Sequence, residues 1–144
     1  MEWALCESMS EKTINNWLSL AEYDLNTADA MFQTKRYLYV AFMCQQAIEK
    51  LLKAAYVKVR SSTPPYTHNL LRLLQSVPWV IEMQSTDLMQ VLEELNSYYI
   101  ESRYSEDIQG LSTILTEKRA EQVLKSTKEL YRWIQDKISS ETRS

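Results

Sequence analysis

Hydrophobic residues recur at steps of three and four along most of this chain, a spacing that predicts long amphipathic helices. The first helix is predicted to begin near Ser8 or Ser10, because Ser8 precedes Glu11 by the spacing of a capping box. Its apolar face consists of Ile14, Trp17, Leu18, Ala21, Leu25, Ala28 and Phe32. The second helix is predicted over roughly residues 36–59, and it is apolar nearly all round.

Prolines and polar caps delimit three further helices. The prolines at positions 64 and 65 must end the second helix, because proline removes a backbone donor and clashes with the preceding turn. The remaining helices are expected over about residues 69–76, over 87–100 beneath a Ser85 or Thr86 cap, and from a Thr116 cap to about Ile138.

These elements predict an all-α fold, an up-and-down antiparallel bundle of four to five helices, because short connections make neighbouring helices antiparallel. Residues 101–112 are the exception, since they are polar, contain the single glycine and are predicted to form a long loop. A loop longer than a bundle needs is a pointer to function. We expect one domain over residues 1–144, with a core over about 10–138 and frayed ends.

Composition supports helices and argues against several other classes. The chain has one glycine in 144 residues, and tight turns depend on glycine, so few tight turns are expected. The longest unbroken apolar run covers residues 37–44, whereas a membrane helix needs about 20 residues. Two cysteines, Cys6 and Cys44, suggest neither a disulfide framework nor a metal site. We therefore expect a cytoplasmic protein without a membrane segment.

Charge is distributed unevenly, although the net charge is only −3. Residues 37–72 hold five bases and one acid, residues 73–110 hold one base and seven acids, and residues 111–144 hold seven bases and five acids. An acidic whole chain excludes a non-specific nucleic-acid coat. A local basic site, or pairing between the oppositely charged segments, stays open.

Candidate chemistry gathers around two positions. His68, the single histidine, follows the proline loop, where it is suited either to proton transfer and phosphate contact or to fixing the loop to the bundle. Arg103 stands alone among acids and is followed by Tyr104. The arginine either pairs with those acids or grips a phosphate in a bidentate manner, with Tyr104 stacking on a base.

Two polar stripes are further candidates. On the second helix, Gln46, Glu49, Lys50 and Lys53 form a narrow stripe that serves as a solvated face, a partner face or a phosphate site. On the last helix, the bases Lys118, Lys125, Lys128 and Arg132 share one side. That stripe is either solvated or follows an RNA backbone or an acidic partner.

The aromatic content suggests a partner surface. Nine tyrosines and four tryptophans accompany only two phenylalanines, and Tyr and Trp are enriched where proteins meet. Five tyrosines are expected to exceed what one bundle can bury: Tyr37, Tyr39, Tyr56, Tyr98 and Tyr99. A homodimer through the second and fourth helices would cover them.

Three motifs together resemble the HEPN domain. They are Gln45-Gln46-Ala47-x-Glu49-Lys50-x-x-Lys53-Ala54, then His68-Asn69-Leu70, then Ser102-Arg103-Tyr104. The resemblance spans roughly residues 15–138 and implies a small helical bundle of a family linked to nucleotide binding, RNA cleavage and toxin–antitoxin pairs. It also implies a homodimer that acts beside a minimal nucleotidyltransferase.

The resemblance leaves three functions open. The first is a module that is not itself catalytic and binds a nucleotide or the nucleotidyltransferase. In this ligand site Lys50, Lys53 and Arg103 would hold the phosphates, Tyr104 would stack and His68 would orient the loop. Gln46 and Glu49 would form the partner face. Apart from such a nucleotide, no cofactor is expected. The second is a metal-independent endoribonuclease using Arg103 and His68, although the Arg-x4–6-His spacing of catalytic relatives is missing here. The third is a helical adaptor without a small ligand.

Overall fold

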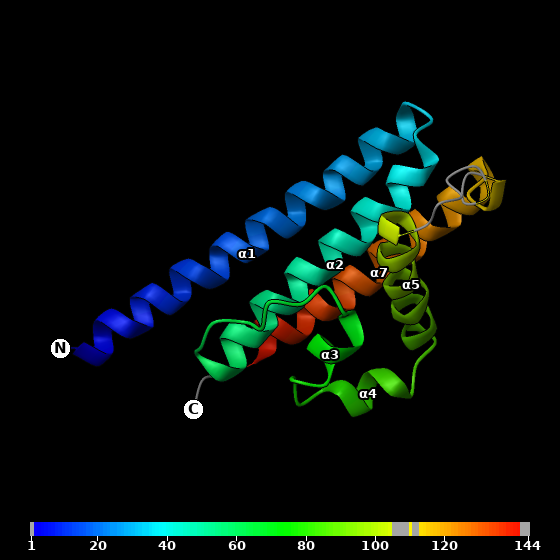
Figure 1. Ribbon diagram of the computed structural model, residues 1–144. Coiled ribbons are helices and arrows are strands. Elements are labelled where there is room, and N and C mark those ends of the chain that lie inside the picture. Colours follow the sequence, from blue (N-terminus) through cyan, green and yellow to red (C-terminus); the bar gives the residue numbers. More distant parts are fainter. Residues whose placement is uncertain (1, 105–109, 111–112, 142–144) are drawn as a thin grey trace.

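The chain forms a bundle of helices in a computed structural model that describes residues 2–104, 110 and 113–141, with side chains over 10–99, 110 and 113–141. The principal helices are α1 (Glu2–Gln33), α2 (Tyr37–Arg60), α3 (Leu70–Leu74), α4 (Val80–Gln84), α5 (Leu88–Tyr104) and α7 (Glu117–Ser140). Figure 1 shows α1, α2 and α7 running alongside one another, with α3 and α4 near one end. The predicted all-α bundle is confirmed.

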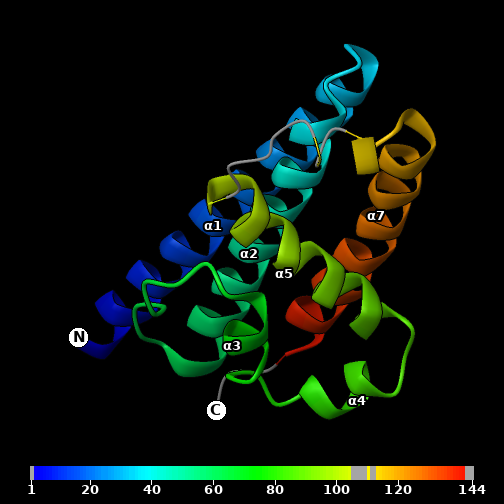
Figure 2. The same ribbon diagram turned by 45° about the vertical axis from the view of Figure 1, so that its right-hand side comes forward.

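Helix α2 is central because it is apolar on most of its circumference. It packs against α1, α3, α5 and α7, and Figure 2 shows α5 crossing beside it. Residues such as Ile48, Leu51 and Leu52 are completely buried. A helix that buries so many positions must have neighbours on several sides, which is why the bundle forms around it.

A tight reversal joins α1 to α2. The Arg36 N–H donates to the Met31 carbonyl at 2.7 Å and the Lys35 N–H donates to the Phe32 carbonyl at 3.1 Å, the bonding pattern of a Schellman motif. Lys35 has a φ of 61°, in the left-handed region that glycine usually occupies. The two longest predicted helices are thereby held antiparallel without a glycine.

Several predicted boundaries agree with the structure. Helix α2 begins and ends within one residue of its predicted span. Asn69 caps α3, its side chain accepting from the N–H groups of Leu71 and Arg72, and Thr116 caps α7 by accepting from Arg119. In each case a polar side chain replaces the missing intrahelical partner.

Two boundaries were predicted wrongly. Helix α1 begins at Glu2, not near Ser8 or Ser10, because the preceding residues contain no helix breaker. Helix α5 continues to Tyr104, whereas a loop was predicted from Glu101. A polar segment extends a helix when neither proline nor glycine stops it, so the lost apolar pattern was a poor stop signal. The rest of the predicted loop, apart from residue 110, lies largely outside the described residues.

Helix α4 was not predicted. It is only five residues long, too short to show a helical period. Trp79 and Met83 lie one turn apart at its start and within it, and both are buried. Tertiary packing therefore stabilises this helix.

As expected, the five tyrosines are not all buried within one chain: Tyr37 and Tyr56 are partly buried and Tyr39 is exposed. Tyr98 and Tyr99 are buried within the single chain, and the Tyr99 ring lies between Phe42 of α2 and His68 of the loop before α3. Across the described part of the chain, no helix has the length and apolar character needed to cross a membrane.

Candidate functional site

The predicted polar stripe of α2 is half buried, since Glu49 and Lys53 are buried while Gln46 and Lys50 are partly exposed. Gln45, Glu49 and Lys53 follow one another at four-residue steps, so they lie on one side of the helix, and Glu49 and Lys53 are only 3% and 6% exposed. Burying an ion is unfavourable unless it is paired and hydrogen-bonded. Gln45, Glu49 and Lys53 therefore belong to an internal polar network and not to a solvated face.

Each charge in the network has a partner. Lys53 Nζ lies 3.3 Å from Glu49 Oε2 and also lies over the Trp17 ring of α1, 5.4 Å from its centroid. Lys50 pairs with the buried carboxylate of Asp24, also from α1. The two lysines thus balance two acids between α1 and α2.

Glu49 also holds His68. Its Oε1 lies 2.8 Å from His68 Nδ1, so each carboxylate oxygen has its own partner. An ionised carboxylate can only accept, which makes Nδ1 the donor and leaves Nε2 as the basic nitrogen of the neutral ring. Within the described part of the chain, Nε2 has no hydrogen-bond partner.

Neighbouring groups fix the position of the His68 ring. The ring stacks on Tyr99 of α5, with centroids 4.5 Å apart, and it meets Tyr66 edge-on at 5.9 Å. Its backbone carbonyl accepts from Gln45 Nε2 at 3.1 Å. The side chain is 32% exposed, so a buried carboxylate orients a ring whose outer part is open to solvent.

Asn96 connects the His68 loop to α5. Its Oδ1 accepts from the Leu70 N–H at 2.8 Å, and its Nδ2 donates to the capping oxygen of Asn69 at 3.2 Å. Leu70 is buried, and its N–H is one of the first in α3, a position without an intrahelical acceptor. The amide of Asn96 therefore sets the start of α3 immediately after His68.

Replacing Asn96 with alanine is expected to lower the free energy of unfolding by about 1–3 kcal/mol, because the buried Leu70 N–H loses its acceptor. Urea unfolding measures this change. Asn96→Asp keeps the acceptor and should lose less than alanine does. Asn16→Ala, at an exposed position of α1, is the matched control and should change stability by less than about 0.5 kcal/mol. Equal losses for Asn96→Ala and its control would contradict the assigned role.

The predicted ligand residues divide into three groups. His68 lies at the surface, as a ligand-binding role requires. The ammonium groups of Lys50 and Lys53 are engaged with Asp24 and Glu49 in the described conformation. Arg103 and Tyr104 belong to α5, with Arg103 one turn beyond Tyr99, but their side chains lie outside the described residues.

The sequence analysis missed Asp24, Gln45, Tyr66 and Asn96 as members of this site. Gln45 carried a signal, because it precedes Glu49 by one turn on the same stripe. Gln46, which was predicted to face a partner, is partly exposed and donates to Gln45 Oε1 at 2.7 Å. Glu49, the other predicted partner-face residue, is buried.

The basic stripe of α7 is partly paired. Lys128 binds Asp29 of α1 at 2.8 Å, while Lys118, Lys125 and Arg132 are exposed. Arg119, beside this stripe, pairs with Glu94 of α5.

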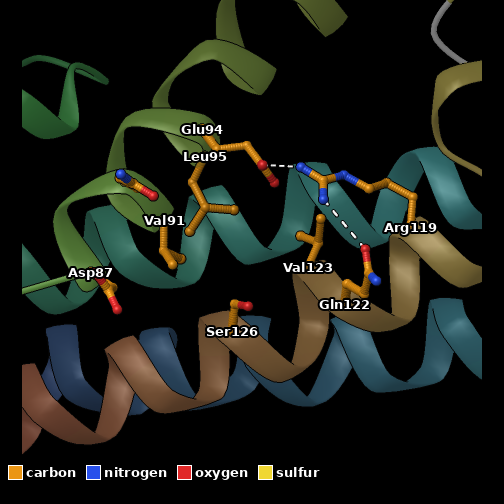
Figure 3. Close-up of a pocket in the computed structure, with 9 residues that line it drawn as sticks. Asp87, Val91, Glu94, Leu95, Arg119, Gln122, Val123 and Ser126 are labelled. Carbon is orange, nitrogen blue, oxygen red and sulfur yellow. Dashed lines mark hydrogen bonds and ion pairs between the residues drawn. The ribbon is translucent and has the colours of Figure 1, made fainter.

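Arg119 also borders a groove of about 400 Å³ between α5 and α7. Figure 3 shows the apolar side chains of Val91, Leu95 and Val123 between the two helices and the Arg119 guanidinium reaching Glu94 and Gln122. Because Glu94 already balances the guanidinium, this groove does not offer an anion a free positive charge. Among the described residues, no cluster of three acidic, histidine or cysteine side chains is suited to a metal ion.

Comparisons with known proteins agree with this fold. TT1696 from Thermus thermophilus is 25% identical with a TM-score of 0.72, over 86% of this chain and 97% of that one. ST0689, an archaeal HEPN homologue, shares the fold at 23% identity with a TM-score of 0.66, over 87% and 97%. No curated protein matches significantly. The HEPN domain family matches residues 14–138. This chain therefore belongs to the HEPN domain family.

Proposed function

We propose that this HEPN domain is a nucleotide-binding module that acts with a minimal nucleotidyltransferase in a two-component, toxin–antitoxin-like system and is not itself catalytic. The observation that carries the proposal is the position of His68, whose side chain is 32% exposed and whose Nε2 has no hydrogen-bond partner among the described residues, while Glu49 holds Nδ1. A fixed imidazole with one free nitrogen is suited to contact a phosphate or a ribose hydroxyl. We also propose that the protein forms a homodimer.

Arg103 supplies the positive charge in this proposal. It follows Tyr99 by one turn of α5, and Tyr99 stacks on the His68 ring. A guanidinium binds phosphate oxygens through two parallel hydrogen bonds, and its charge strengthens both of them. Lys50 and Lys53 stay with their acids, where they keep the network neutral and the His68 loop in place.

Arg103→Ala is expected to weaken binding of adenosine 5′-monophosphate by about 1–3 kcal/mol, the usual worth of a hydrogen bond to a charged group. Isothermal titration of the purified protein measures the change. Arg132→Ala removes an exposed arginine of α7 and is the matched control, with unchanged affinity expected. An affinity pull-down from the native host, run with the same variants, should recover a nucleotidyltransferase with wild type and less with Arg103→Ala.

Failure to bind any nucleotide near millimolar concentration would contradict the proposed binding function and favour a helical adaptor. Recovery of only the protein itself in the pull-down would contradict the obligate partner. Equal effects of Arg103→Ala and Arg132→Ala would show a general charge effect instead of a local contact.

A second candidate is a metal-independent endoribonuclease, which the Glu49–His68 pair favours. A carboxylate bound to Nδ1 holds an imidazole in the tautomer that accepts a proton at Nε2, the arrangement of a general base. Arg103 would hold the scissile phosphate. Cleavage of a synthetic RNA by the wild type, reduced roughly 10²–10⁴-fold in His68→Gln, would support this candidate over the binding module.

A further inference from the structure

We infer that Tyr66 is a stacking platform for the base of a nucleotide whose phosphate reaches His68; this inference rests on the proposed nucleotide-binding function. The site would take a nucleoside monophosphate or one nucleotide of a single strand. Tyr66 belongs to none of the three motifs that carry the family resemblance.

Tyr66 is the most exposed of the large hydrophobic side chains in the described part of the chain, at 95%. A single exposed aromatic residue is ordinary on a protein surface and proves nothing by itself. The ring of Tyr66, however, lies 5.9 Å from that of His68, edge-on at 66°. An exposed aromatic face thus adjoins the one imidazole of the protein.

The loop that carries Tyr66 is restrained on both sides. Pro64 and Pro65 precede it and fix their own φ angles. After it, Thr67 Oγ1 accepts from the Asn69 N–H at 3.1 Å, and Gln45 holds the His68 carbonyl. A ligand that stacks on this ring orders little additional chain, so less conformational entropy is lost on binding.

Four rings form a continuous series that ends at this surface. Phe42 of α2 stacks near Tyr99 of α5 at 6.2 Å, Tyr99 stacks on His68 at 4.5 Å, and His68 meets Tyr66. Tyr66 is the outermost ring of the series. The base of a bound nucleotide would stack on the exposed face of Tyr66 and extend this series by one ring.

Tyr66 and His68 would each bind a different part of the same nucleotide. Every base presents a π-face, so Tyr66 would accept a base with little sequence preference. The base and the 5′-phosphate of one nucleotide are joined through a single ribose, and the His68 ring lies 5.9 Å from the Tyr66 ring. Nucleotides are therefore expected to bind more tightly than sugar phosphates that lack a base.

Two probes separate the contribution of the base from that of the phosphate. Adenosine 5′-monophosphate carries both groups, and ribose 5-phosphate carries only the phosphate. Tyr66→Ala is expected to weaken binding of adenosine 5′-monophosphate by about 5- to 150-fold, the range for a base stacked on an aromatic ring, and to leave ribose 5-phosphate unchanged. Tyr66→Phe keeps the ring and should bind like the wild type.

Tyr23→Ala is the matched control, because Tyr23 is 71% exposed but lies on α1. Both alanine variants remove an exposed ring, so urea unfolding should show less than about 0.5 kcal/mol of change for each and establish that they are folded. Isothermal titration of each variant with both probes completes the experiment.

The outcomes distinguish this inference from the proposed function. If the wild type and Tyr66→Ala bind adenosine 5′-monophosphate equally well, the inference is overturned and the proposed function still stands. Equal weakening of both probes would also overturn it, because the loss would then concern the phosphate. Wild type that binds neither probe would contradict the proposed function itself, and the inference with it.

Discussion

Replacing Glu49 with alanine is expected to lower the free energy of unfolding by about 3–5 kcal/mol, the usual effect of leaving one member of a buried ion pair without its partner. Lys53 is 6% exposed and has the Glu49 carboxylate as its anion, while the Trp17 ring supplies only a cation–π contact. His68 would lose the acceptor at Nδ1 as well. Urea unfolding of both proteins measures the difference.

A double substitution tests the cause of that loss. Methionine at both Glu49 and Lys53 removes the two buried charges together, and buried pairs replaced by apolar residues often lose little stability. The double variant should therefore be more stable than Glu49→Met alone. Glu121→Ala, on the exposed side of α7, is the control for losing a glutamate and should change stability by less than about 0.5 kcal/mol. A double variant no more stable than Glu49→Met would exclude the unpaired charge as the cause.

Alkaline pH is expected to destabilise the protein through Cys44. Burial raises the pKa of the Cys44 thiol from 9.0 to about 12 in the folded protein, and the Thr127 hydroxyl and the charge of Asp29 modify this shift less. Between these values the folded protein keeps a proton that the unfolded chain has lost. The stabilisation is fully present below pH 9 and is lost as the pH rises toward 12, at about 1.4 kcal/mol per pH unit.

Urea unfolding at intervals between about pH 8 and 10 measures this dependence. Burial also raises the pKa of Tyr131, from 10.0 to about 12, so Tyr131 changes the stability mainly above pH 10. The chosen pH range therefore excludes most of its contribution. Cys44→Ala removes the thiol and should flatten the pH dependence, although its stability near neutral pH falls because of the small cavity. An unchanged slope in Cys44→Ala would show that another group is responsible.

Local chemistry explains the parts of the fold that were predictable. The bounds of α2 follow from its periodicity and from the prolines after it, and the caps Asn69 and Thr116 follow from side-chain oxygens placed before apolar runs. The end of α5 was not predictable in this way, because residues 101–104 neither favour burial nor break a helix. The five-residue α4 depends on the burial of Trp79 and Met83, which no local pattern reveals.

The site was only half predictable. His68, Glu49 and Lys53 were recognised as unusual, but the sequence left their roles open because each role depends on a partner in space. Glu49 and His68 are 19 residues apart, and Asn96 binds the Leu70 N–H across 26 residues. Lys53, which was predicted to bind a phosphate, is buried and pairs with Glu49 in the described conformation.

The sequence by itself determined that this chain is a helical bundle and which residues form α2 and α7. It also determined that His68 lies at the end of a proline loop. These features depend on periodicity, caps and helix breakers within a few residues of one another. Only the tertiary structure decided which charges are neutralised and which groups remain open. Packing α1 and α5 against α2 pairs Lys50 with a buried acid, encloses the Glu49–Lys53 pair and stacks Tyr99 on His68. The same packing leaves the His68 side chain partly exposed and Tyr66 exposed. Ion pairing and burial are properties of distance in space, and helical periodicity does not specify that distance between helices.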